Sequence, residues 1–125
     1  GVYEVQGLPV TPYMVPQDCG MHMQTKWLEI VRKTSLDNTD RGGRSSRLKI
    51  TAEEGKDFAF SCLPYTAQEL ENAMHHEELP PARRTVVSIF GAVRGVGGIN
   101  SWGADVEDIY HISGEQDISY GFWIE

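Results

Sequence analysis

The chain has 125 residues, the size of an ordinary domain with a single core. Its composition, 40% hydrophobic and 23% charged, is typical of soluble globular proteins and excludes a disordered or collagen-like chain. A formal net charge of -7 argues against a nucleic-acid partner, because phosphate binding needs a basic face. No apolar run approaches the roughly 18 residues of a membrane span, so no membrane partner is expected.

The first residues suggest a piece of a longer polypeptide. The sequence begins at Gly1 without a methionine and without the charged-then-apolar plan of a secretory signal. The compartment therefore stays open between cytoplasm and periplasm. Cys19 and Cys62 are compatible with a disulfide in an oxidising compartment or with free thiols, and we expect free thiols.

Proline and glycine break the first 26 residues, which predicts extended connection with at most short strands. Apolar and aromatic residues then predict strands over 27–31, 48–51 and 58–62. Polar turns are expected between them, at 37–46 and 53–57. This series predicts an antiparallel meander.

A helix is predicted from Thr66, where residues 66–69 have the form of a capping box. Leu70, Ala73 and Met74 share one helical face, and the prolines at 80 and 81 end a helix of about three turns. Residues 85–90 predict a strand buried on both faces, and residues 118–124 a last strand. These elements predict an all-β, mainly antiparallel sandwich with one short inserted helix over residues 1–125.

The segment 95–103 carries four glycines around Trp102. It is not a phosphate loop, because Asn100 stands where a dinucleotide fingerprint needs its third glycine and no long helix follows. Two interpretations remain open. Glycine-only backbone conformations present the Trp102 ring to a ligand such as a sugar, or the segment is a turn with Trp102 in the core.

Two further clusters contain side chains that can bind metals. His75 and His76 point about 100° apart on a helix and do not share a metal easily, so a helix end is favoured. The acidic residues between 105 and 108 lack the alternating ligands of a calcium loop, which favours a solvated acidic turn. No metal site is expected in this chain.

Five landmarks in order give a resemblance that spans nearly the whole chain. Residues 13–20 are similar to Tyr-x-x-Pro-Gln-Glu-x-Gly, 26–28 to Arg-Trp, 58–66 to Phe-Ser-x-x-Pro-Tyr-Thr, and 69–75 to Glu-Leu followed by Ala-x-His. The strongest match is 95–103, against Gly-x-Gly-Gly-x-x-Ser-Trp-Gly. On these motifs the chain resembles the C-terminal half of the last domain of bacterial β-galactosidases of glycoside hydrolase family 2.

The resemblance implies half of a galactose-mutarotase-like super-sandwich. It implies a multidomain retaining hydrolase of terminal β-D-galactosides such as lactose, usually a homo-oligomer, with magnesium and a monovalent cation near its active site. Its catalytic glutamates would lie in a barrel domain outside this chain, so we expect no catalytic residue here and no activity from the chain alone. The partners implied are the rest of the same polypeptide and the galactoside.

The resemblance also implies a substrate-binding role for Trp102, as a platform for the leaving sugar. The loop residues that present it are Gly97, Gly98, Asn100, Ser101 and Gly103. Asn100 departs from the family's usual acidic residue, and Cys19 and His22 replace commoner residues near Gly20. The ring itself is kept. We expect Trp102 to be exposed and Trp27 and Trp123, on strands, to be mostly buried.

Two rival functions remain. A free-standing carbohydrate-binding β-sandwich module would use Trp102 with other aromatic residues. A mutarotase-like enzyme is suggested only by the fold family, and the histidine and glutamate pair that epimerisation needs is not evident.

Overall fold

The computed structural model describes residues 1–9, 13–33 and 45–125. These residues divide into two compact units, which are described separately. The first contains residues 1–23 and 59–90, and the second contains residues 24–58 and 91–125. Among the described residues, no helix is long and apolar enough to cross a membrane.

One sheet has the strand order β1-β4-β5, with β1 at His22–Thr25, β4 at Phe58–Leu63 and β5 at Val86–Phe90. Strands β4 and β5 are antiparallel. Every residue of β5 is half-buried, so the prediction of a strand buried on both faces is wrong. Most of the buried residues of the first unit lie on β4 or at the following helix, and the full set is Pro16, Ala59, Ser61, Leu63, Leu70 and Ala73.

The helix α1 runs from Ala67 to Asn72 and is shorter than the three turns predicted. Its capping box is confirmed: the Thr66 hydroxyl accepts from the Glu69 backbone N–H at 3.2 Å, and the Glu69 carboxylate accepts from the Thr66 N–H at 2.8 Å. The helix ends because Ala73 is extended, and the Met74 N–H donates to the Glu78 carboxylate at 2.8 Å instead of continuing the helix.

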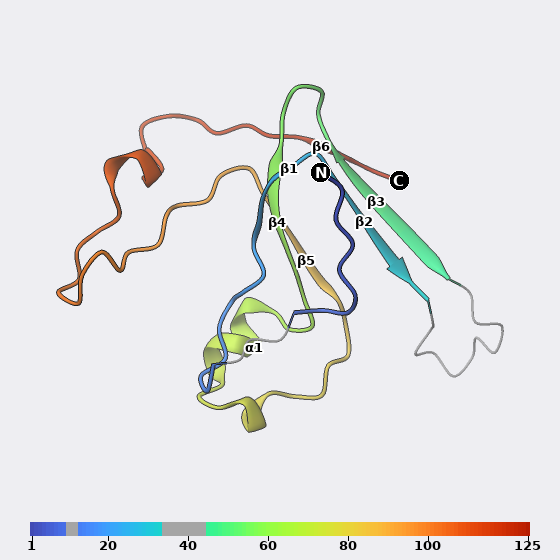
Figure 1. Cartoon of the computed structure of the whole chain (residues 1–125), viewed down its shortest axis with the longest axis horizontal. Helices are drawn as coiled ribbons and strands as arrows, with labels where there is room; N and C mark the ends of the chain where they lie inside the picture. Colours follow the sequence, from blue (N-terminus) through green and yellow to red (C-terminus); the bar gives the residue numbers. More distant parts are fainter. Residues whose placement is uncertain (10–12, 34–44) are drawn as a thin grey trace. The chain divides into compact units, whose positions relative to one another are not determined.

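The second sheet has the order β2-β3-β6, with β2 at Trp27–Arg32, β3 at Ser46–Ala52 and β6 at Phe122–Ile124, and both pairings are antiparallel (Figure 1). The meander prediction is correct for β2 and β3 but wrong for β4, which pairs in the other sheet. Strand β6 is also shorter than predicted. The polar turn expected at 37–46 lies largely outside the described residues.

The core of the second unit contains Ile50, Ala52, Phe58 and Val106. The rings of Phe58 and Phe122 meet edge to face, 6.5 Å apart. The long segment between β5 and β6 is irregular apart from a 3-10 turn at Asp108–Tyr110 (Figure 1). The elements as a whole, antiparallel strands with one short α-helix in the described part of the chain, confirm the all-β class.

Candidate functional site

The glycine-rich loop of the second unit presents Trp102 to solvent. Trp102 is 92% exposed, and two further apolar side chains of the same loop, Val96 and Ile99, are also exposed. The expected exposure of Trp102 is therefore confirmed, and its interpretation as a core residue is wrong. A flat apolar ring held in water suits the apolar CH face of a sugar and adds large contact area with little ordering.

Glycine is required in this loop for two different structural reasons. Gly98 and Gly103 have φ of 118° and 78°, a region that residues with a Cβ rarely adopt. At Gly95 the reason is close approach, since an added Cβ would lie 2.6 Å from the Tyr110 Cβ. These positions shape the backbone on both sides of Trp102.

Asn100 is the polar anchor inside the loop. Its side-chain oxygen accepts from the Trp102 backbone N–H at 2.9 Å and from the Ala104 N–H at 3.3 Å. An asparagine that accepts from the backbone two residues ahead forms an Asx turn. Both hydrogen bonds hold the backbone around Trp102 and leave its indole ring uncovered.

The base of the loop is closed by an ion pair that the sequence analysis missed. Arg94 pairs with Asp105, and the Gly95 N–H donates to the Tyr110 carbonyl at 2.9 Å. His111 Nε2 lies 3.0 Å from the Val106 carbonyl oxygen and 3.6 Å from Asp105. The opposite charges of Arg94 and Asp105, placed on either side of the glycine-rich run, were the signal available in the sequence.

Asp105 is held in its ionised form. The Val106 backbone N–H donates to its carboxylate at 2.8 Å and lowers its pKa, and the Arg94 side chain lowers this pKa further. The acidic turn predicted at 105–108 is thus a closing contact for the loop.

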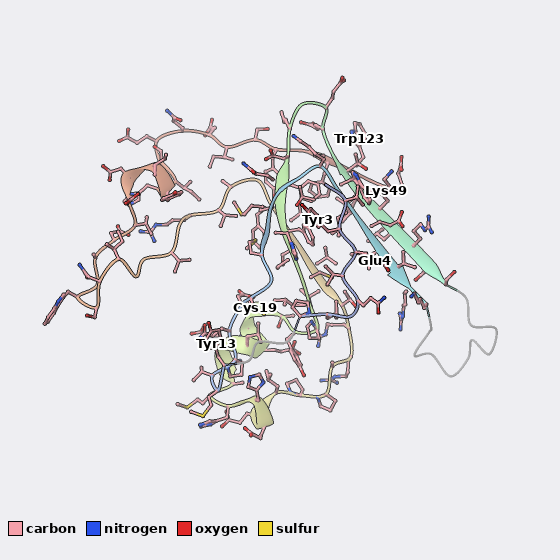
Figure 2. The ribbon with its side chains drawn as sticks, viewed as in Figure 1. Tyr3, Glu4, Tyr13, Cys19, Lys49 and Trp123 are labelled. Atoms are coloured by element: carbon pink, nitrogen blue, oxygen red, sulfur yellow. The ribbon has the colours of Figure 1, made fainter. Side chains whose placement is uncertain are left out.

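Trp27 and Trp123 are not mostly buried, so that prediction is wrong. They are 44% and 66% exposed. Both pair directly with Thr51 across the sheet β2-β3-β6, which places all three side chains on one face. The opposite face carries Ile50 and Ala52, the buried residues of this sheet. Figure 2 shows Trp123 and Lys49 on this sheet, and the Lys49 ammonium lies 5.9 Å from the centre of the Trp27 ring.

The histidines at 75 and 76 serve local structure in the first unit. His75 Nδ1 lies 3.3 Å from the Glu78 carboxylate, whose pKa is lowered chiefly by the Met74 N–H. His76 contacts the Tyr13 carbonyl oxygen. Neither residue belongs to α1, so the predicted helix end is not where they lie.

The described residues form no metal-binding site. No three side chains of histidine, cysteine, aspartate or glutamate converge there as a metal site would require. None of the described residues is therefore assigned to the magnesium or the monovalent cation implied by the resemblance.

A hollow of about 440 Å³ lies in the first unit, lined mainly by leucine and proline side chains, with Cys19 and His76 among its polar members. Cys19 and Cys62 are free thiols, as expected. Burial raises the pKa of the Cys62 thiol, which makes it a poor nucleophile.

The chain matches the family model described as beta galactosidase small chain over residues 1–124. It is 58% identical over 124 residues to the beta-galactosidase small subunit of Latilactobacillus sakei, covering 99% of this chain and 39% of that protein. It is 38% identical over 108 residues to beta-galactosidase BgaC of Bifidobacterium adolescentis, covering 86% of this chain and 9% of that protein.

A third relative is the beta-galactosidase of Streptococcus thermophilus, 34% identical over 114 residues, with 91% of this chain and 10% of that protein covered. The chain thus spans about two fifths of the small subunit and about a tenth of the longer relatives. No solved structure gave a significant match. With the family model matching all but the last residue, this chain belongs to the β-galactosidase small chain family.

Proposed function

We propose that this chain is a component of a β-galactosidase and supplies an aromatic platform to its sugar site. The observation that supports this most is the combination of family membership with a solvent-exposed Trp102 at the tip of a shaped loop. The substrate class is terminal β-D-galactosides such as lactose, and the reaction is retaining hydrolysis. The family 2 assignment and the place of the chain at the C-terminal end of a super-sandwich belong to the same proposal.

The catalytic carboxylates lie outside this chain in our proposal. A retaining glycosidase needs a nucleophilic carboxylate about 5 Å from an acid whose pKa is raised. Among the described residues, the carboxyl groups whose pKa is shifted have a lowered pKa, not a raised one. Hydrogen bonds lower the pKa values of Glu69, Glu78 and Asp105, chiefly those from the backbone N–H groups of Thr66, Met74 and Val106. These acids are suited to holding the backbone rather than to donating a proton to a leaving group.

The partner in this proposal is the remainder of a larger β-galactosidase polypeptide, which carries the barrel with the two glutamates. The small share of the long relatives that this chain covers supports that role. Magnesium, the monovalent cation and a homo-oligomeric state are proposed for the whole enzyme only.

A second candidate is a carbohydrate-binding module that acts without a catalytic partner. The exposure of Trp27, Trp102 and Trp123 supports it, because accessible indole rings can stack on the apolar faces of sugars. The two candidates differ in what the isolated chain does. A binding module holds an oligosaccharide by itself, whereas a platform component acts on the sugar only within the assembled enzyme.

Substitution of Trp102 in the whole enzyme tests the platform. We expect Trp102→Ala to raise KM for lactose about fivefold to tenfold, because a good aromatic contact is worth about 1 kcal/mol or somewhat more. We expect kcat to change less than about twofold, since the chemical step does not use this ring. Trp102→Phe keeps an aromatic ring and should therefore raise KM less than Trp102→Ala does.

Val96→Ala is the matched control, because Val96 is 94% exposed in the same loop but carries no ring. It should leave both constants unchanged. If Trp102→Ala left KM unchanged in a correctly assembled enzyme, the platform role would be wrong.

A further inference from the structure

The backbone of the loop sets where the Trp102 side chain projects into solvent. The ring is 92% exposed, and none of the ring contacts between described residues involves it. With no packing on the indole, its position depends on where the backbone places its Cα and on two side-chain torsions. Whatever fixes the backbone at Trp102 therefore fixes the point and direction at which this side chain leaves the loop.

Asn100 is the side chain that does this. Its amide oxygen accepts from the N–H of Trp102 at 2.9 Å and of Ala104 at 3.3 Å. The two N–H groups lie on either side of Gly103, whose φ of 78° is in the left-handed region that favours glycine. One acceptor thus ties together both arms of the turn that carries the ring.

The base of the loop is held independently of Asn100. Arg94 pairs with Asp105, and the Gly95 N–H donates to the Tyr110 carbonyl at 2.9 Å. Removal of the Asn100 acceptor should therefore loosen the tip of the loop while the base and the rest of the second unit keep their contacts.

We propose that Asn100 is a positioning residue for Trp102, and this rests on the platform function proposed above. Asn100 preorganises the backbone from which the ring meets the sugar. A loop that is already ordered loses less conformational freedom on binding, and this gain is realised in substrate binding rather than in bond cleavage. The expected signature is a change in KM with little change in kcat.

Comparison of asparagine, aspartate and alanine at position 100 distinguishes the effect of the acceptor oxygen from that of the rest of the side chain. Asn100→Asp keeps an acceptor oxygen at the same reach, so it should rescue the turn. Asn100→Ala removes the acceptor. Asn100→Leu keeps the same branched shape without any acceptor and serves as the second variant if the alanine variant assembles poorly.

The experiment uses the whole β-galactosidase that contains this chain, with lactose as the probe. Two readouts are taken for each variant: steady-state constants, and hydrogen exchange of the Trp102 and Ala104 amides. We expect Asn100→Ala and Asn100→Leu to speed exchange at both amides and to raise KM about threefold to tenfold, with kcat within about twofold. Asn100→Asp and the control Val96→Ala should match the wild-type enzyme in both readouts.

Two results would overturn the proposal. Unchanged exchange in Asn100→Ala would show that the side chain does not order the turn. Faster exchange with an unchanged KM, in an enzyme where Trp102→Ala does raise KM, would show that the order of the turn does not position the platform. Failure of the platform function itself is recognised separately, because Trp102→Ala would then leave KM unchanged whatever the exchange rates at position 100.

Discussion

At the scale of single residues, the loop around Trp102 combines three kinds of constraint. Positive φ at Gly98 and Gly103 allows the backbone path, Asn100 ties the turn, and the Arg94–Asp105 pair closes the base. The Asp105 carboxylate must be ionised to pair with Arg94 and to accept strongly from the Val106 N–H. The geometry of the loop is thus linked to the protonation state of Asp105.

This linkage predicts a pH dependence. The pKa of Asp105 is lowered in the folded chain, chiefly by the Val106 N–H and then by Arg94. The contribution of the carboxylate is therefore fully present above the unfolded-state pKa of about 3.9 and is lost as the pH falls through the folded-state pKa. Protection of the Val106 amide from hydrogen exchange, relative to an unstructured peptide, should stay constant from about pH 6 to about pH 4 and fall as the pH is lowered further, from about 4 to about 2.

Asp105→Asn supplies the control for this experiment. The amide oxygen still accepts from the Val106 N–H but does not titrate in this range, so protection should stay flat with pH. Protection in the wild-type chain that is the same at both ends of the range would contradict the role given to Asp105.

The sequence could predict part of this site. The four glycines around Trp102 left two interpretations open, an exposed loop and a turn with Trp102 in the core. The family resemblance favoured the exposed loop, and the exposure of Trp102 is confirmed. The Arg94–Asp105 contact could not be predicted from local pattern, because the two residues meet only when the glycine-rich run folds back on itself. Burial of Trp27 and Trp123 was predicted from their strand positions, yet strand alternation alone does not say which face of a sheet is covered.

At the scale of elements, the sequence predicts local structure correctly but does not predict which strands pair over long range. The capping box at Thr66 and the antiparallel pairing of β2 with β3 agree with the sequence. Strand β3 takes β6 as its second neighbour, a strand about 70 residues further along the chain. Such long-range pairing depends on tertiary packing that short apolar runs do not encode.

The capping box gives a stability prediction at this scale. Thr66→Ala removes the hydroxyl that accepts from the Glu69 N–H, and we expect it to lower the free energy of unfolding by about 1 kcal/mol. Thr66→Ser keeps the hydroxyl and should cost much less. Urea denaturation of the two variants in parallel measures the difference, and an alanine variant as stable as wild type would show that the cap contributes nothing to so short a helix.

At the scale of the whole molecule, large apolar side chains remain in contact with water. Trp27 and Trp123 share one face of the second sheet, and the segment after β5 adds exposed Ile109, Ile118 and Trp102. Exposed apolar surface of this extent is typical of a surface that another protein segment covers. In our account that segment is the remainder of the larger polypeptide.

The isolated chain should therefore self-associate in a way that depends on this sheet face. We expect Trp123→Lys to shift the chain toward monomer in sedimentation velocity, because a charge on this face opposes its burial. Gln68→Lys is the matched control, since it adds the same charge at an exposed position of α1 in the other unit. A wild-type chain that stays monomeric at all concentrations would argue against a covered face.

The central claim is that this chain belongs to a β-galactosidase whose catalytic carboxylates lie elsewhere. Hydrolysis of a chromogenic β-galactoside by the purified 125-residue chain, produced in a host without any β-galactosidase, tests this directly. We predict no turnover above the uncatalysed background, together with full activity of the whole enzyme in the same assay. Turnover by the chain alone, abolished by substitution of one of its own carboxylates, would contradict the account.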